Sequence, residues 1–434
     1  MSGMAFLSSR KAHVLGAVLL ASGMWFYVNH VLIPYQQADA AAHGRPRGNL
    51  SDLYPRWLGA RELLLRHRDP YSGQVTGEIQ AGYYGRKLDP SRTDDPKDQQ
   101  AFAYPAYVAF LLAPTVAAPF EKVKIAFEWL LVVLTAATIW LWLRVIRWRP
   151  ESGSLVTLVI LTAGSFPAVQ GFKLQQLSLL VAFLIALSTA LIAGKRLFAS
   201  GAVLAAATIK PQLALPLAVG LTLWAVSDWE KRQQFLWGFA ATMAALVGGA
   251  ELILPGWIGC FRQAVRDYES YTGGMSMLDV LLSPVWGRLV GVAVVLGLAA
   301  ICWRWRKENT EAVAFALMIA LVLLGTLMVI PSFAPYNQLL LLPAIFLVLH
   351  DLRRLWAWGW WSKAAVALAG GATVWPWLAA LGLSLASFVV APQSVERAWW
   401  LPLYPFVKLP LPVVWLAPLT FLVVPVWRHS ARTS

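Results

Sequence analysis

Long apolar segments recur along almost all of this chain of 434 residues, separated by short polar stretches. A helix needs about 20 apolar residues to cross a bilayer, and only helices and closed barrels satisfy their backbone hydrogen bonds there. We therefore predict an all-α polytopic membrane protein, a helical bundle of about 12 transmembrane helices. The candidate spans are 12–33, 123–143, 154–169, 175–193, 197–209, 211–227, 235–254, 283–302, 311–330, 337–350, 364–388 and 410–427.

The composition agrees with a bilayer environment. Hydrophobic residues make up 58% of the chain and charged residues only 13%, whereas a soluble domain has roughly 25% charged residues. The net charge of +14 could indicate nucleic-acid binding, but most basic residues lie in short loops between apolar spans. We expect the protein to be embedded in a lipid bilayer and to have no nucleic-acid partner.

The distribution of Lys and Arg predicts the orientation, because cytoplasmic loops carry an excess of both. With the N-terminus inside, basic residues occur in every inner loop and few occur in the short outer loops. Both termini are then cytoplasmic. The first span lacks a small-residue cleavage site before Pro34 and is read as retained. Cys260 and Cys302 fall on opposite sides, so no intramolecular disulfide is expected. These features are compatible with a bacterial inner membrane.

We predict a single integral membrane domain over residues 1–434. It would contain a periplasmic loop at 34–122 with interfacial helices at about 52–66 and 102–118. Counting 102–118 as a span would invert everything that follows, and Pro105 and Pro114 interrupt it. The remaining parts are a transmembrane module at 123–254, a periplasmic loop at 255–282 and a C-terminal transmembrane module at 283–427.

Asp52 begins an amphipathic pattern just outside the first span. Leu53, Trp57, Ala60 and Leu64 share one face at helical spacing, and Arg56, Arg61, Glu62 and Arg66 are polar. In one interpretation Ser51 or Asp52 caps the helix, with Pro55 in its first turn. In the other, Asp52 is a general base that accepts a proton from an alcohol. The two are compatible, since a cap position would hold the carboxylate rigidly.

Three polar breaks between apolar segments fall on the predicted outer side. Lys210-Pro211-Gln212 is one, and it suggests an anion site at a helix start, although a snorkelling lysine is the alternative. Arg56, Arg61 and Lys210 could together clamp a lipid phosphate. The other breaks are 170–176 and 331–338. The loop after residue 254 adds Tyr268 and Glu269, which suit a sugar site but also a solvated helix.

Several motifs are not found in the sequence. A Gly-rich loop ending in Gly-Lys-Ser or Gly-Lys-Thr is missing, so ATP-driven transport is not supported. Neither a His-Glu-x-x-His motif nor a Cys pair is present, so a zinc site is not expected.

The polar segments as a set resemble a known family. Segments 52–54, 59–65 and 68–71 look like the first outer loop of GT-C glycosyltransferases, specifically the bacterial polyprenol-phosphate-mannose-dependent alpha-1,2-mannosyltransferase family. Segment 102–105 followed by 111–114 is similar to that family's Tyr-Pro-Pro segment, with Ala106 in place of the second Pro. Gln170-Gly171 with Gln175, and Lys210-Pro211-Gln212, match in order and spacing.

The resemblance implies a membrane hexosyltransferase, with mannose as the expected sugar. It would use a polyprenyl-phosphate sugar as donor and a glycolipid or glycan as acceptor on the periplasmic side. No cofactor is expected, and a metal ion is not required. Asp52 would be the catalytic base of an inverting transfer. Lys210, Arg56, Arg61 and Lys173 would bind the donor phosphate or lipid. Substrate binding is expected from Tyr54, Asp69, Tyr104, Gln170, Gln175, Gln212, Tyr268, Glu269, Tyr336 and Asn337.

A secondary transporter or flippase of lipid-linked sugars is the alternative from another class. Such proteins use short, broken helices near the midplane and often contain internal repeats. Here the breaks lie at the predicted outer edge and no repeat is evident, so the transferase is favoured.

Overall fold

The computed structural model describes residues 2–42, 51–89, 91–331 and 334–432, and every regular element in these ranges is a helix. The first half contains α1 (Ser2–Tyr27), η1 (Val28–Leu32), α2 (Ile33–Ala42), α3 (Tyr54–Arg66), α4 (Gly73–Tyr84), α5 (Val108–Leu112), η2 (Ala113–Thr115), α6 (Phe120–Ile146), α7 (Ser152–Ala163), α8 (Phe166–Lys173), α9 (Leu177–Ala193), α10 (Leu197–Ala207) and α11 (Pro211–Val226). The second half contains α12 (Trp229–Ile253), α13 (Trp257–Thr272), α14 (Met277–Leu282), α15 (Pro284–Trp305), α16 (Val313–Val329), η3 (Pro335–Leu341), α17 (Leu342–His350), α18 (Leu352–Ala357), α19 (Trp360–Ala386), α20 (Pro392–Arg397), η4 (Leu401–Leu403), α21 (Tyr404–Val407) and α22 (Leu411–Arg432).

The prediction of an all-α membrane protein is confirmed. Among the described residues, 6 helical stretches are long and apolar enough to cross a membrane, and the pair α7 and α8, bent by 53°, raises this to 7 if it forms one span. Each predicted span overlaps at least one helix, but α9, α10, α11, α16 and the stretch Pro335–His350 have only 10–17 residues, fewer than a membrane span needs. The count of about 12 spans therefore stays a prediction.

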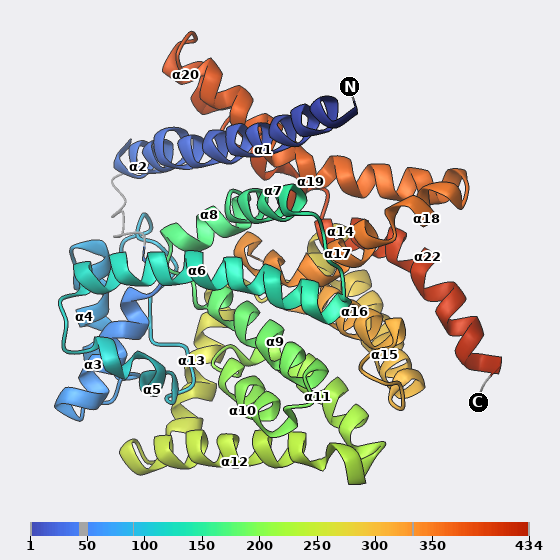
Figure 1. Ribbon diagram of the computed structural model, residues 1–434. Coiled ribbons are helices and arrows are strands. Elements are labelled where there is room, and N and C mark those ends of the chain that lie inside the picture. Colours follow the sequence, from blue (N-terminus) through green and yellow to red (C-terminus); the bar gives the residue numbers. More distant parts are fainter. Residues whose placement is uncertain (1, 43–50, 90, 332–333, 433–434) are drawn as a thin grey trace.

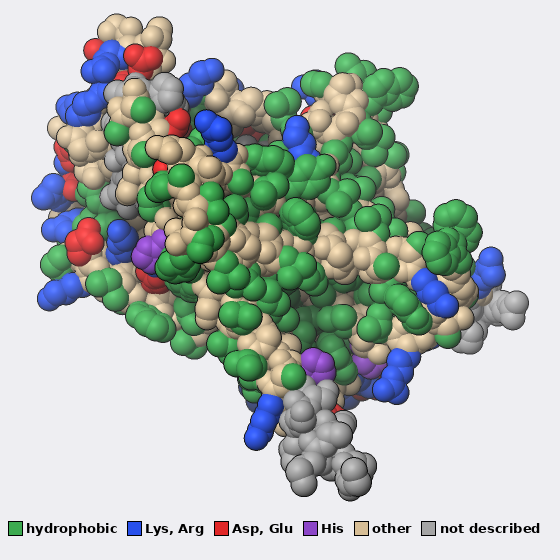
Figure 2. Space-filling view, turned by 90° about the horizontal axis from the view of Figure 1, so that it is seen from above, with side chains coloured by type: hydrophobic (Ala, Val, Ile, Leu, Met, Phe, Trp, Pro, Cys, Tyr) green, Lys and Arg blue, Asp and Glu red, His purple; other side chains and the backbone are tan. Residues whose placement is uncertain are grey.

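The long helices run roughly side by side, and α3, α4 and α5 gather at one end of the bundle (Figure 1). We call this the α3 end. From α16, residues 314–328 are buried throughout, so this helix forms the centre of the core. The apolar windows of α12 and α15 are only 11% buried, so these helices form the outer surface. Figure 2 shows hydrophobic side chains over the middle of one face and the acidic side chains gathered at its left edge.

At the α3 end, an ion-pair network around the buried Glu62 connects α3 with α4. Glu62 is only 1% exposed, and its carboxylate contacts Arg66 at 2.9 Å and Arg68 at 2.7 Å. Arg68 also reaches Glu78 of α4 at 2.6 Å. Glu62 is one of the polar residues of the predicted amphipathic pattern, and in the structure its buried carboxylate is paired with two arginines. The helix predicted at 52–66 is confirmed as α3.

The predicted helix at 102–118 is shorter in the structure. Only Val108–Leu112 is α-helical, and a short 3-10 turn follows. Pro105 and Pro114 lack the N–H that a continuous helix would need. The first part of the segment is buried, and Phe102 is packed directly against Gly59 of α3, where a Cβ would lie 2.3 Å from its ring. Similarly, the predicted loop 255–282 contains the helices α13 and α14.

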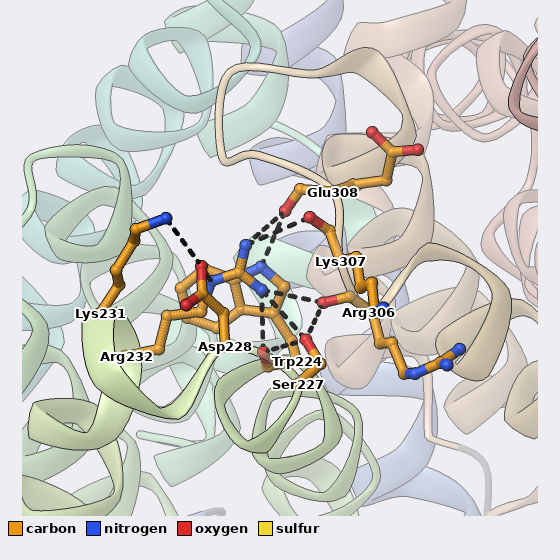
Figure 3. Close-up of polar contacts among 8 residues, drawn as sticks. All are labelled: Trp224, Ser227, Asp228, Lys231, Arg232, Arg306, Lys307 and Glu308. Atoms are coloured by element: carbon orange, nitrogen blue, oxygen red, sulfur yellow. Dashed lines mark hydrogen bonds and ion pairs between the residues drawn. The ribbon is translucent and has the colours of Figure 1, made fainter. Parts of the chain in front are cut away.

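The opposite end of the bundle is held by Arg232 of α12 (Figure 3). Arg232 is 6% exposed and stacks over Trp224 at 4.2 Å. Its Nη1 donates to the carbonyls of Trp224 and Arg306, both at 2.9 Å, and its Nη2 donates to the carbonyl of Glu308 at 3.2 Å. The guanidinium therefore joins the C-terminal ends of α11 and α15, where unpaired carbonyls favour a cation.

We expect Arg232→Ala to lower the free energy of unfolding by about 1–3 kcal/mol, because several buried carbonyls lose a charged donor. Lys231→Ala is the matched control, since Lys231 is 80% exposed and its ammonium pairs with Asp228 at 3.6 Å. Thermal unfolding in detergent should show a loss for the Arg232 variant alone. Equal unfolding temperatures for the two variants would contradict this assignment.

Candidate active site

A pocket of about 580 Å³ opens at the α3 end of the bundle. Six separate parts of the chain meet there: the start of α3, the loop before α5, the break before α9, the break before α11, helix α13, and the segment around η3. Its lining residues are Asp52, Arg56, Asp98, Gln100, Ala101, Ala103, Tyr104, Pro105, Gln176, Ile209, Lys210, Pro211, Gln212, Phe261, Arg262, Val265, Arg266, Tyr268, Glu269, Tyr271, Ile330, Pro331, Tyr336 and Asn337.

Asp52 lies in this pocket, but it is not a helix cap. Helix α3 begins at Tyr54, and its N-cap residue is Leu53, with no side-chain cap hydrogen bond. The capping interpretation is therefore wrong, although Pro55 does lie in the first turn. Asp52 is positioned instead by its backbone, whose N–H donates to the carbonyl of Leu174 at 2.9 Å.

The carboxylate of Asp52 is available for acid–base chemistry. Its Oδ2 accepts a hydrogen bond from Nε2 of Gln176. Burial raises the pKa of Asp52 above its ordinary value, and the nearby charges of Arg56 and Lys210 oppose this shift. A carboxylate whose pKa is raised toward neutral pH holds a proton better, which suits a general base.

Lys210 places a buried cation beside this carboxylate. It is 7% exposed, and its Nζ donates to Oε1 of Gln176 at 2.9 Å and to Oγ of Ser178 at 2.6 Å. The ammonium also lies 5.7 Å from the ring of Tyr104 and 5.3 Å from that of Tyr336. Within the described part of the chain, no carboxylate approaches Nζ to 4 Å. A buried ammonium without a direct counter-ion is a good site for an anion.

Arg56 is the second cation of the pocket. Its Nη1 donates to the carbonyl of Asp52 at 3.0 Å, and its guanidinium lies 4.6 Å from the ring of Tyr104. Burial opposes the charged form, but Tyr104 and Asp52 outweigh it and raise the pKa of Arg56. Its Nε is buried without a hydrogen-bond partner among the described residues. Arg56 therefore keeps donor capacity for a ligand.

Six of the predicted substrate residues line the same pocket. Tyr104, Tyr268 and Tyr336 supply aromatic faces, and Gln212, Glu269 and Asn337 supply polar groups. Asn337 also accepts a hydrogen bond from Ser178 at 2.7 Å, which connects it to Lys210. The break at 331–338 is described except for residues 332–333, which lie outside the described residues.

Two predicted phosphate ligands do not line the pocket. Arg61 stacks over Trp57 of its own helix at 5.3 Å. Lys173 pairs with Glu128 of α6 at 3.2 Å and lies 5.1 Å from the ring of Trp25. Each of these cations contacts neighbours outside the pocket.

Four predicted substrate residues are also placed elsewhere. The ring of Tyr54 packs edge-on against Phe120 at 4.8 Å. Asp69 accepts from the backbone N–H of Tyr71 at 2.8 Å. Gln175 donates to backbone carbonyls at the end of α8, and Gln170 lies on α8 itself. None of the four lines the pocket. In the structure these four side chains lie in local contacts instead.

The sequence reasoning missed Gln176, which contacts both Asp52 and Lys210. Gln176 lies in the break that sequence analysis identified, and the available signal was that it directly follows the selected Gln175. It also missed Asp98, whose carboxylate accepts from the backbone N–H of Gln100 at 2.9 Å and from its side chain at 2.8 Å. No motif marks Asp98, since only folding brings its loop to the pocket.

Comparison with known proteins identifies the class of this membrane protein. A model of glycosyltransferase family 87 matches residues 102–331, just over half of the chain. The chain therefore belongs to this GT-C-type membrane family and is a membrane glycosyltransferase. The matched region contains Tyr104, Gln176 and Lys210, while Asp52 and Tyr336 lie outside it. No curated protein and no solved structure matches the chain.

Proposed function

We propose that this glycosyltransferase moves a hexose, with mannose as the first candidate, from a polyprenyl-phosphate sugar to a glycolipid or glycan acceptor. The reaction would take place on the periplasmic side of a bacterial inner membrane. The observation that carries the proposal is that Asp52 and Lys210 lie in a single pocket, hydrogen-bonded to the nitrogen and the oxygen of the same amide, that of Gln176. Such a pair provides a proton acceptor and a phosphate-binding cation together.

In the proposed step Asp52 takes the proton of an acceptor hydroxyl as its oxygen attacks the anomeric carbon. A new carbon–oxygen bond forms while the bond to the phosphate oxygen breaks, and its electron pair leaves with the phosphate. Lys210 and Arg56 stabilise the negative charge that develops on that group. A single displacement inverts the anomeric centre, so a beta-linked donor gives an alpha-linked product.

The rest of the pocket suits a sugar attached to an isoprenoid. Tyr104, Tyr268 and Tyr336 offer aromatic surfaces for a pyranose ring. Gln212, Glu269 and Asn337 offer hydrogen-bonding groups for its hydroxyls. The apolar lining from Ile209, Phe261 and Ile330 would contact the first isoprene unit.

Membership in a glycosyltransferase family favours this enzyme over the transporter or flippase. The pocket adds to that preference, because a pure transporter needs no general base. The proposal assigns charge neutralisation to Lys210 and Arg56, so no metal cofactor is invoked.

The test is transfer by the purified protein in detergent or proteoliposomes. We expect label to move from a radioactive polyprenyl-phosphate mannose to a glycolipid acceptor, with an alpha linkage in the product. Parallel reactions replace the donor by a polyprenyl-phosphate glucose or by a nucleotide sugar, and a further reaction contains EDTA. Transfer should persist in EDTA and fail with the nucleotide sugar. Movement of the lipid donor across the bilayer without transfer would instead support the flippase.

A further inference from the structure

Gln176 joins the two ends of the proposed catalytic machinery. It directly precedes α9 and its side chain is 3% exposed. Its Nε2 donates to Oδ2 of Asp52, and its Oε1 accepts from Nζ of Lys210 at 2.9 Å. We propose that Gln176 is a positioning residue that sets the orientation of the base relative to the cation at the leaving group. This inference rests on the proposed function.

The chemistry of the two contacts requires a primary amide of this length. Asp52 needs a donor and Lys210 needs an acceptor, and a primary amide carries both on one carbon atom. A carboxylate in this position could only accept, so it would repel Asp52. An asparagine has the same two groups but is shorter by one methylene, so it cannot reach both partners from the same backbone position.

The backbone of Gln176 is itself held firmly. Its N–H donates to the carbonyl of Gly171 at 2.8 Å, and its carbonyl accepts from Leu179 at 3.1 Å. Gly171 is packed closely against Leu179, where a Cβ would lie 2.4 Å from the side chain. The break between α8 and α9 therefore provides a rigid base for the amide. Rigid support of this kind is what a precisely placed catalytic group needs.

The same network continues beyond Lys210 to η3. Nζ of Lys210 donates to Oγ of Ser178 at 2.6 Å, and Ser178 donates to Oδ1 of Asn337 at 2.7 Å. Hydrogen bonds thus connect Asp52, Gln176, Lys210, Ser178 and Asn337 in one continuous line. Movement of the cation on binding a phosphate would consequently be felt at the base through Gln176.

The amide also affects the acid–base state of Asp52. A hydrogen bond to the charged form of a carboxyl group favours that form, and the Gln176 contact lowers the pKa of Asp52 against the effect of burial. The other charged and titratable groups facing Asp52 are Arg56 on α3, Lys210 before α11 and Asp98 in the loop before α5. Tyr268 on α13 and Tyr336 in η3 complete the set.

Gln176→Asn is the direct test, with Gln175→Asn as its matched control. Both changes remove one methylene from neighbouring buried amides, but the Gln175 amide donates to the carbonyls of Phe172 and Lys173. We expect Gln176→Asn to lower kcat by about 10²-fold, since misplacement by about 1 Å has that cost. In the pH profile of kcat/KM, the fall in rate on the acid side should occur at higher pH for Gln176→Asn than for the wild type. Gln176→Glu should move this acid limb further in the same direction. Gln175→Asn should lower stability and leave the limb in place.

A second measurement does not depend on activity. The difference in unfolding temperature between the wild type and Asp52→Asn, followed against pH, changes until Asp52 is fully ionised in the folded protein. The pH at which this difference levels off should rise when both proteins also carry Gln176→Asn. An unchanged levelling point together with an unchanged acid limb would overturn the role of Gln176. Failure of all transfer by the wild type, with a shifted levelling point, would reject the proposed function but retain the link between Asp52 and Gln176.

Discussion

Replacing Asp52 by Asn should lower kcat by about 10²–10⁴-fold, the usual contribution of a general base. The variant loses the proton acceptor but little else. Asn keeps a carbonyl oxygen at the same length, so the hydrogen bond from Gln176 can persist. The backbone tie from residue 52 to the carbonyl of Leu174 does not involve the side chain. The measurement is kcat and KM for donor and acceptor, with expected losses mainly in kcat.

The same substitution should not destabilise the protein. Burial raises the pKa of Asp52 in the folded state, so folding favours the protonated form. The corresponding stability is fully present below the pKa of the unfolded chain, near 3.9, and is lost as pH rises through the higher folded-state pKa. At neutral pH the ionised Asp52 therefore costs stability, and Asp52→Asn should unfold at an equal or higher temperature. The wild-type rate should fall on the acid side, with an apparent pKa above 3.9.

Asp98→Asn is the control within the same pocket. Asp98 is also a lining carboxylate, but both of its oxygens are occupied by Gln100. We expect its loss of kcat to stay within about tenfold, since it would not take the proton of the acceptor. If Asp98→Asn abolished turnover and Asp52→Asn did not, the base would have to be reassigned to Asp98.

The elements of the fold could be predicted from hydropathy because the spacing of apolar residues is a local property. Each predicted span has its helix, and the Lys210–Pro211 break does end α10 and begin α11. What could not be predicted is which apolar segments are buried, because the outer surface of a membrane bundle is as apolar as its core. Segment 102–118 was placed at an interface because its composition suits one, yet Phe102 lies in the core against Gly59.

Two residues that the sequence singles out lie in one pocket. Lys210 stands out because it interrupts an apolar run, and Asp52 because it begins the amphipathic pattern of α3. The sequence could not distinguish the adjacent residues Gln175 and Gln176, because their side chains point in different directions from the same tight turn. The Gln175 amide contacts carbonyls at the end of α8, whereas the Gln176 amide contacts Asp52 and Lys210. Likewise Lys173 resembles Lys210 in sequence, and only the packing of α8 against α6 shows that Glu128 neutralises it.

Lys210→Met should reduce kcat/KM for the donor by about 10²–10³-fold, as expected when one donor to a developing charge is removed. Met is close to Lys in length and lacks its charge, so the hole between Tyr104 and Tyr336 stays filled. Because Lys210 lowers the pKa of Asp52, the acid limb of the kcat/KM profile should also move to higher pH. The direct measurement is inhibition by a free polyprenyl phosphate compared with the polyprenol that lacks the phosphate.

Wild-type protein should prefer the phosphate over the alcohol, and Lys210→Met should lose about 10–100-fold of that preference, the free-energy scale of one hydrogen bond to a charged group. Lys173→Met is the matched control. This lysine was also predicted to bind phosphate, but it pairs with Glu128 at 3.2 Å and lies outside the pocket lining. It should keep the preference for the phosphate. Intact discrimination in Lys210→Met would place the phosphate away from Lys210, and its loss in Lys173→Met alone would assign the phosphate to Lys173.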